Sequence, residues 1–158
     1  LDLSGISSPY AILIQAGSGK TVGDLNGEEQ MYPASLTKMM TAIVAIEELK
    51  DLDQEITLTQ EMFAGLYEQD ATQAGFQPGE TVRAIDLLYG VMLPSGAECC
   101  IALSYAIAGS EQGFADLMNK KSRKAWNGRN SFSVTAQDFI IRIITVRQKI
   151  WQFFYSMR

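Results

Sequence analysis

Short apolar runs separated by turn residues predict strands in the first part of the chain. Ala11–Ala16 (AILIQA) has the length of a strand, and Thr21–Asp24 follows it after the glycine-containing segment GSGK. Two extended segments around such a turn form a β-hairpin. A further short strand is predicted at Ile56–Thr59, and Gln77–Glu80 (QPGE) has the composition of a turn.

Longer apolar patterns with helical spacing predict the helices. From Ser35 to Lys50 no glycine or proline interrupts the chain. Apolar residues cover most of the circumference of this segment, which is typical of a buried helix; they are Leu36, Met39, Met40, Ile43, Val44, Ile46 and Leu49. The same spacing predicts further helical segments over Thr59–Tyr67, Val82–Leu93, Ala97–Ala108 (ended by Gly109-Ser110) and Glu111–Lys121.

Composition limits the chemistry that is open to this chain. The 158 residues are 47% apolar, which is enough for one domain, or part of one, with a core. There is no histidine, which excludes Ser-His-Asp catalysis, Cys-His catalysis and every histidine-bearing metal site. Cys99 and Cys100 are adjacent, so they make neither a disulfide framework nor a metal-ligand spacing. We expect two small buried side chains there, and no cofactor.

Charge divides the chain into two parts. Residues 1–121 carry 6 basic and 17 acidic side chains, a net charge of −11, whereas residues 122–158 carry 7 basic and 1 acidic, a net charge of +6. The acidic part argues against nucleic acid as a partner. No signal peptide and no apolar run of transmembrane length is present in the sequence. Composition therefore allows a cytoplasmic protein or an exported one whose signal has been removed.

One stretch resembles a phosphate-binding loop, which makes a nucleotide-binding protein an alternative. Residues 16–21 (AGSGKT) match the end of the pattern G-x-x-x-x-G-K-[ST]. The pattern requires a glycine where Ile14 stands, and the residues that follow, TVGDLN, lack the helical pattern that should come next. Gly17 and Gly19 are better explained as residues of a hairpin turn.

Residues 32–42 (YPASLTKMMTA) contain the most informative pair of polar residues. Ser35 and Lys38 are three positions apart at the start of a predicted helix, so the hydroxyl and the amine can meet over one turn. A serine needs a neighbouring base to become a good nucleophile. A poorly hydrated lysine amine can lose its proton and act as that base, and a helix N-terminus stabilises negative charge that develops nearby. The alternative is a helix N-cap serine beside a solvated lysine.

The surroundings of this pair carry a family resemblance. PASLTKMMTA, AGFQPGETV and LLYGVMLPSGAE, in this order and spacing, resemble the serine DD-carboxypeptidases among the low-molecular-weight penicillin-binding proteins. The resemblance implies an α/β fold of the α+β type, β-lactamase/transpeptidase-like, in which a helical cluster packs on an antiparallel sheet, here incomplete at the C-terminus. It also implies an exported enzyme that removes the terminal D-alanine from peptidoglycan stem peptides.

The resemblance implies three catalytic residues. Ser35 would be the acylated nucleophile and Lys38 its proton acceptor, as in the family's S-x-x-K element. Ser95 opens the segment that corresponds to the family's Ser-x-Asn element and would pass a proton to the leaving amine. Ala97 stands where the family has asparagine, so one hydrogen bond to Lys38 or substrate is missing, which bears on efficiency and substrate choice. The third element, Lys-Thr-Gly, is absent; the one Lys-Thr pair, residues 20–21, lies in the predicted hairpin.

Partners and location follow from the same resemblance. The substrate would be a stem peptide that ends in D-Ala-D-Ala, and β-lactam antibiotics would be acylating inhibitors. The enzyme would be extracytoplasmic, on the outer face of the cytoplasmic membrane, and would meet the membrane only through a C-terminal anchor that is missing here. We expect the 158-residue chain, without the Lys-Thr-Gly strand, to be weak or inactive. The alternative is a non-catalytic remnant or peptidoglycan-binding module on the same fold, with Ala97 in its favour.

The segment after Lys121 loses the resemblance and reverses the charge. We therefore predict two parts: 1–121, the N-terminal part of the DD-peptidase domain, and 122–158, a non-family tail. Taken as it stands, FIIRIITVRQKIWQFFY would be a basic amphipathic or β-prone segment that touches a membrane. We prefer a shift of reading frame. Codons for residues 125–132 can be written that give Leu-Gly-Met-Glu-Glu-Thr-His one base later, and codons for residues 134–153 can give Tyr-Ser-Thr-Ala-Lys-Asp-Met-Ala; both resemble the family's continuation.

Overall fold

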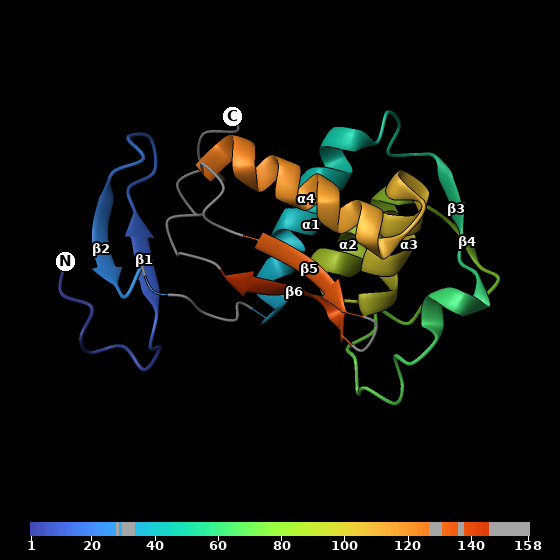
Figure 1. The fold of residues 1–158 in the computed structure, drawn as a ribbon, viewed down its shortest axis with the longest axis horizontal. Helices are drawn as coiled ribbons and strands as arrows, with labels where there is room; N and C mark the ends of the chain where they lie inside the picture. Colours follow the sequence, from blue (N-terminus) through green and yellow to red (C-terminus); the bar gives the residue numbers. More distant parts are fainter. Residues whose placement is uncertain (28, 30–33, 127–130, 136–137, 146–158) are drawn as a thin grey trace.

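The structure, a computed structural model, describes residues 1–27, 29, 34–126, 131–135 and 138–145. Figure 1 shows hairpin β1–β2 at one end, a cluster of helices in the middle, the β3–β4 pair at the other end, and hairpin β5–β6 over the cluster. The elements in chain order are β1 (Ala11–Ile14), β2 (Thr21–Leu25), η1 (Ala34–Leu36), α1 (Thr37–Glu48), β3 (Glu55–Thr57), η2 (Gln60–Phe63), β4 (Thr81–Arg83), α2 (Ala84–Met92), α3 (Ala97–Ala108), α4 (Glu111–Trp126), β5 (Ser131–Thr135) and β6 (Asp138–Thr145). The predicted α+β class is confirmed, and the described strands form three two-stranded antiparallel sheets.

The predicted N-terminal hairpin is confirmed. Strand β1 pairs antiparallel with β2, with Ile12 opposite Asp24. Gly17 and Gly19 in the connecting turn have φ values of +94° and +67°, a left-handed conformation that glycine adopts without steric cost. A strand therefore follows AGSGKT where a phosphate-binding loop requires a helix, which removes the structural basis of the nucleotide-binding alternative.

The helix predicted over residues 35–50 begins differently and is less buried than expected. Its first turn, η1, is a 3₁₀ helix, and the α-helix α1 begins only at Thr37. Helix α1 packs against α2, α3 and α4 and buries Met40. Leu36 and Ile46 are 46% and 54% exposed. The prediction of a helix buried on nearly all sides is therefore wrong near the two ends of α1, where neighbouring helices do not cover these side chains.

Two further helical predictions need correction between β3 and α2. The segment 59–67 is helical only over η2, and Gly65, with φ of +77°, follows in a series of turns. Val82 belongs to strand β4, where it pairs with Ile56 of β3, so α2 begins two residues later than expected, at Ala84. The predicted turn between the two strands is confirmed, because the Glu80 N–H donates to the Gln77 carbonyl at 3.2 Å.

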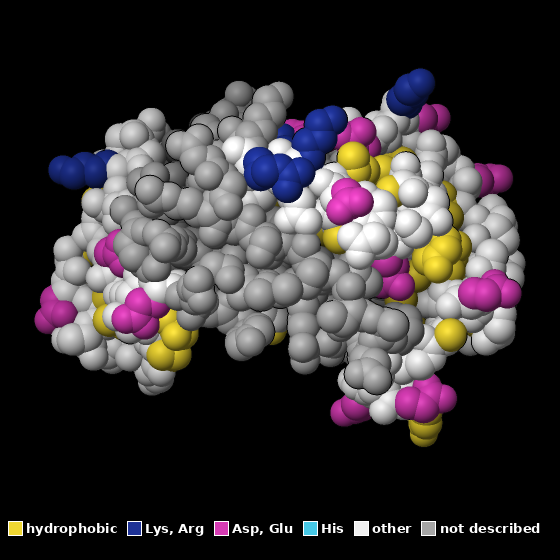
Figure 2. All heavy atoms as spheres, in the orientation of Figure 1, with side chains coloured by type: hydrophobic (Ala, Val, Ile, Leu, Met, Phe, Trp, Pro, Cys, Tyr) yellow, Lys and Arg dark blue, Asp and Glu magenta, His cyan; other side chains and the backbone are white. Residues whose placement is uncertain are grey.

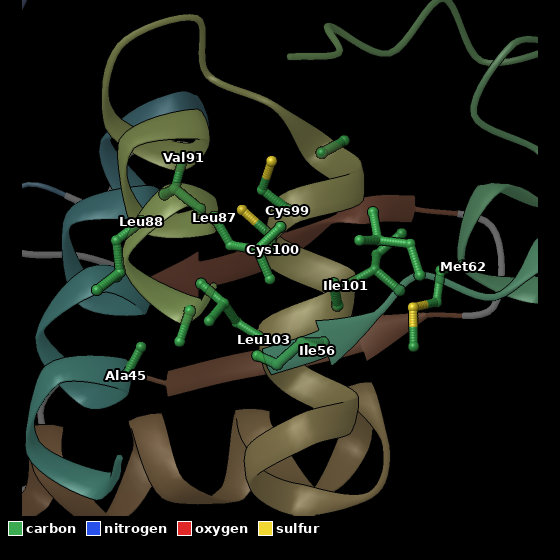
Figure 3. Packing of buried hydrophobic residues seen from close by; sticks show 14 of the residues in the cluster. Ala45, Ile56, Met62, Leu87, Leu88, Val91, Cys99, Cys100, Ile101 and Leu103 are labelled. Carbon is green, nitrogen blue, oxygen red and sulfur yellow. The ribbon is translucent and has the colours of Figure 1, made fainter. Parts of the chain in front are cut away.

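Helices α2 and α3 form the centre of the hydrophobic core. Figure 3 shows Leu87 and Val91 of α2 beside Cys99 and Cys100 of α3. Helix α3 has the predicted bounds, and Gly109 ends it in the left-handed conformation. The core cluster consists of Ala42, Ala45, Ile56, Leu58, Met62, Leu66, Ala84, Leu87, Leu88, Val91, Ala97, Cys99, Cys100, Ile101, Ala102 and Leu103. The turn that joins α2 to α3 is thus anchored at both of its ends in the core.

The two cysteines should resist thiol reagents as long as the protein is folded. Both are free and buried, as predicted, and burial raises the pKa of Cys100 to about 12 and shifts the pKa of Cys99 in the same direction. The thiolate is the reactive form, so at about pH 8 an aromatic disulfide reagent should detect no thiol in native protein. After unfolding in guanidinium it should detect both. A thiol that reacts at the same rate with and without guanidinium would contradict this burial.

The end of the described chain carries helix α4 and hairpin β5–β6. Helix α4 continues to Trp126, past the predicted end at Lys121, and the Lys121 amine donates to the Glu47 carboxylate of α1. The predicted boundary after residue 121 falls inside this helix. The frame-shift hypothesis concerns in part residues 127–130, 136–137 and 146–158, which lie outside the described residues, and it stays a prediction.

Acidic side chains are spread over the face in Figure 2 and do not gather into one patch. None of the helices in the described ranges is long and apolar enough to cross a membrane.

Candidate active site

The start of α1 brings the Ser35 hydroxyl to the Lys38 amine. Ser35 lies in η1 and Lys38 in the first turn of α1. Residues i and i+3 of a 3₁₀ turn lie almost directly above one another. Lys38 Nζ is 3.4 Å from Ser35 Oγ, at the long end of the hydrogen-bond range. The N-cap of α1 is Leu36, with no side-chain cap bond, so a capping role does not account for Ser35.

A second hydroxyl reaches this pair from the turn between α2 and α3. Ser95 Oγ donates a hydrogen bond of 3.0 Å to Ser35 Oγ, although 60 positions separate the two residues. The backbone of Ser95 has φ of +66°, a left-handed conformation that costs a non-glycine residue roughly 1–2 kcal/mol. The next residue attaches the turn to α2, because the Gly96 N–H donates to the Gly90 carbonyl at 2.8 Å.

The three polar side chains open onto one cavity of about 440 Å³. Among the described residues its walls are otherwise apolar, and those that line it are Ser35, Leu36, Lys38, Met39, Val91, Met92 and Ser95. Ser35 is exposed, whereas Lys38 and Ser95 are half-buried. A space of this size admits a small ligand or the end of a peptide, so a substrate can reach Ser35 from solvent.

This arrangement suits acyl transfer. Ser35 offers a hydroxyl nucleophile, Lys38 an amine that can take up its proton, and Ser95 a second hydroxyl that can carry a proton onward. All three residues predicted from the sequence therefore meet in the structure. Tyr32 and Pro33 of the same sequence motif lie outside the described residues.

Two departures from the family pattern can be located in the fold. Ala97 begins α3 with 3% exposure and is not part of the cavity lining, so it contributes no polar group to the site. The Lys20-Thr21 pair lies in hairpin β1–β2, which stands apart from the helical cluster in Figure 1. Neither position supplies the groups that the family's second and third elements would bring to the cavity.

Sequence reasoning missed one polar residue next to this site. Glu98, in the first turn of α3, is 0% exposed. Its Oε1 accepts hydrogen bonds from the Ala74 N–H at 2.6 Å and the Gly75 N–H at 3.0 Å. The available signal was a single charged residue in the otherwise uncharged stretch AECCIALSYAIA, because a buried carboxylate requires partners elsewhere in the fold.

The chain is similar to a well-defined group of proteins. A family model described as D-alanyl-D-alanine carboxypeptidase matches residues 2–135. The D-alanyl-D-alanine carboxypeptidase DacC of Escherichia coli is 37% identical over 124 residues, which cover 72% of this chain and 30% of that protein. The enzyme DacF of Bacillus subtilis is 32% identical over 125 residues, 77% of this chain and 31% of its own length. The chain thus spans less than a third of the length of these curated relatives.

The fold is also similar to that of solved penicillin-binding proteins. Penicillin-binding protein 5 from Haemophilus influenzae has a TM-score of 0.79 and 25% identity, over 97% of this chain and 46% of that one. The family match also extends past residue 121, through β5, while the division into residues 1–121 and 122–158 stays a prediction. By the range of its family match, the chain belongs to the D-alanyl-D-alanine carboxypeptidase family.

Proposed function

We propose that the protein containing this chain is a serine-type D-Ala-D-Ala carboxypeptidase that acts through an acyl-enzyme on Ser35. The observation that carries the proposal is the contact of one hydroxyl with both an amine and a second hydroxyl, on the wall of an accessible cavity. The non-catalytic alternative rests on Ala97 and on the absent Lys-Thr-Gly element. Neither of these features removes the three groups that a hydroxyl nucleophile requires.

The reaction would proceed in two stages. In the first, Ser35 Oγ attacks the carbonyl carbon of the penultimate D-alanine while the Lys38 amine accepts the hydroxyl proton. The tetrahedral intermediate collapses and the peptide bond breaks, while the proton that Lys38 accepted passes by way of Ser95 Oγ to the leaving amine of the terminal D-alanine. In the second stage, water attacks the ester on Ser35, and Lys38 takes up a proton of that water and returns it to Ser35 Oγ as the ester bond breaks. The products are free D-alanine and the shortened stem peptide.

The same chemistry accounts for the proposed partners and location. The substrate is a peptidoglycan stem peptide that ends in D-Ala-D-Ala, and a β-lactam, whose ring amide can acylate the same hydroxyl, is an inhibitor. We place the enzyme outside the cytoplasm, on the outer face of the cytoplasmic membrane, because its substrate is exposed there. Attachment through a C-terminal anchor stays a prediction of the family resemblance.

Mapping the site of acylation tests this proposal. The protein is incubated with a fluorescent penicillin, digested with trypsin and analysed by mass spectrometry. Residues 21–38 form a tryptic peptide in which Ser35 is the one serine, so the position of the acyl group can be assigned directly. We expect the label on this peptide, together with release of D-alanine from a stem-peptide mimic. Label confined to other peptides, or no label and no D-alanine release, would overturn the proposal.

A further inference from the structure

Glu98 is a buried acidic residue that takes no part in the proposed reaction. Glu98 is fully buried, although its neighbours along α3 are small or apolar. Oε1 is paired with two backbone N–H groups, while Oε2 is buried without a hydrogen-bond partner among the described residues. A buried carboxylate is costly unless well compensated. An apolar side chain would fill this place in the core at lower cost, so a role beyond packing is indicated.

The partners of Glu98 belong to a loop that packs on the turn bearing Ser95. Two residues before Ala74, the Thr72 carbonyl accepts a hydrogen bond of 2.8 Å from the Ala97 N–H. The contact is close, because a Cβ added at Gly96 would lie 2.8 Å from the Ala74 Cβ and 3.0 Å from the Ala74 N. Segment 72–75 therefore packs directly against the turn. The Glu98 carboxylate connects this segment to α3 through hydrogen bonds.

The turn needs support from neighbouring segments because Ser95 is held in an unfavourable backbone conformation. A left-handed φ of +66° at a non-glycine residue persists only where the surrounding structure over-determines it. Two attachments are available: Gly96 is bonded to Gly90 of α2, and the start of α3 is bonded to segment 72–75. The second attachment depends on Glu98 for two of its three hydrogen bonds.

We infer that Glu98 is a positioning residue, which holds the Ser95 hydroxyl against Ser35 by tying segment 72–75 to the start of α3. The inference rests on the proposed function of Ser95. Glu98 does not line the cavity, so it acts on the reaction only through the placement of the Ser95 turn. Its loss should therefore slow acylation and leave the initial binding of penicillin almost unchanged.

Acylation kinetics of Glu98 variants in the full-length protein provide the test. For Glu98→Ala we expect a rate constant of acylation that is roughly 10- to 100-fold lower, which is the scale of a small misplacement of a reacting group. The dissociation constant of the initial penicillin complex should change little.

Glu98→Gln keeps one oxygen acceptor for the Ala74 and Gly75 N–H groups, so its acylation rate should fall less. This variant also covers the case in which Glu98→Ala fails to fold. Glu111→Gln, a half-buried carboxylate at the start of α4, is the matched control.

A double-mutant cycle separates positioning from general stabilisation. If Glu98 acts through Ser95, then adding Glu98→Ala to Ser95→Ala should cause no further loss of acylation rate per folded molecule. Independent losses in the double variant, or single variants that acylate at the parent rate, would overturn the inference while the proposed function stands. A parent protein that penicillin does not acylate would overturn the proposed function and this inference with it.

Discussion

Replacing Lys38 by alanine should lower the rate of acylation by penicillin by roughly 10²–10⁴-fold, the typical contribution of a general base. Lys38 is the one amine among the described residues of the cavity wall, at 3.4 Å from the hydroxyl that must lose its proton. Without it, no amine base is left among the described cavity residues to accept the Ser35 proton. The fold should be nearly unchanged, because Lys38 is only half-buried and the core cluster does not include it.

Two companion variants make this experiment specific. Lys38→Arg keeps a positive charge but cannot be deprotonated, so it should be as slow as Lys38→Ala if the amine acts as a base. Lys20→Ala removes an exposed lysine of the β1–β2 hairpin and should acylate at the parent rate. Thermal unfolding of each variant checks the fold. A Lys38→Ala protein that acylates as fast as the parent would show that the base lies elsewhere, and fast acylation by Lys38→Arg would show that charge alone suffices.

Local signals in the sequence were sufficient to predict an element where residues at its own ends determine where it begins and ends. Helix α3 has the predicted bounds, since Ser95-Gly96 precedes it and Gly109 supplies the left-handed end that other residues avoid. The β1–β2 hairpin follows from its turn glycines in the same way. The triple of Ser35, Lys38 and Ser95 was predictable as well, but from the family resemblance, because no local pattern brings Ser95 to a residue 60 positions away.

The predictions that were wrong or incomplete have a common physical origin: each depends on contacts between segments that are distant in the sequence. Val82 has helical spacing to the apolar residues that follow it, yet pairing with Ile56 places it in a strand. Ile46 fits a buried helix by its spacing, but it is 54% exposed, because none of the described elements covers that position. The role of Glu98 depends on backbone groups 23 and 24 positions away. Spacing describes what one element can bury, whereas the partner that completes the burial is a property of the whole fold.

Replacing Ser95 should separate activity from stability. Ser95→Ala and Ser95→Gly both remove the hydroxyl that donates to Ser35 Oγ, so both should slow acylation roughly 100-fold or more. Their stabilities should differ. At φ of +66° a Cβ is unfavourable, and glycine relieves that cost but loses more entropy on folding. Ser95→Gly should therefore be more stable than Ser95→Ala by up to about 1 kcal/mol in denaturant unfolding.

The comparison of these two variants tests the origin of the strain as well as the proton path. If both variants acylate equally slowly and Ser95→Gly is the more stable, the hydroxyl is needed for the reaction. The protein then keeps serine in this left-handed turn at a cost in stability. If Ser95→Ala were the more stable variant, the turn would not impose the left-handed conformation in solution. If either variant acylated like the parent, proton transfer to the leaving group would bypass Ser95, and Lys38 would have to deliver the proton directly across the cavity.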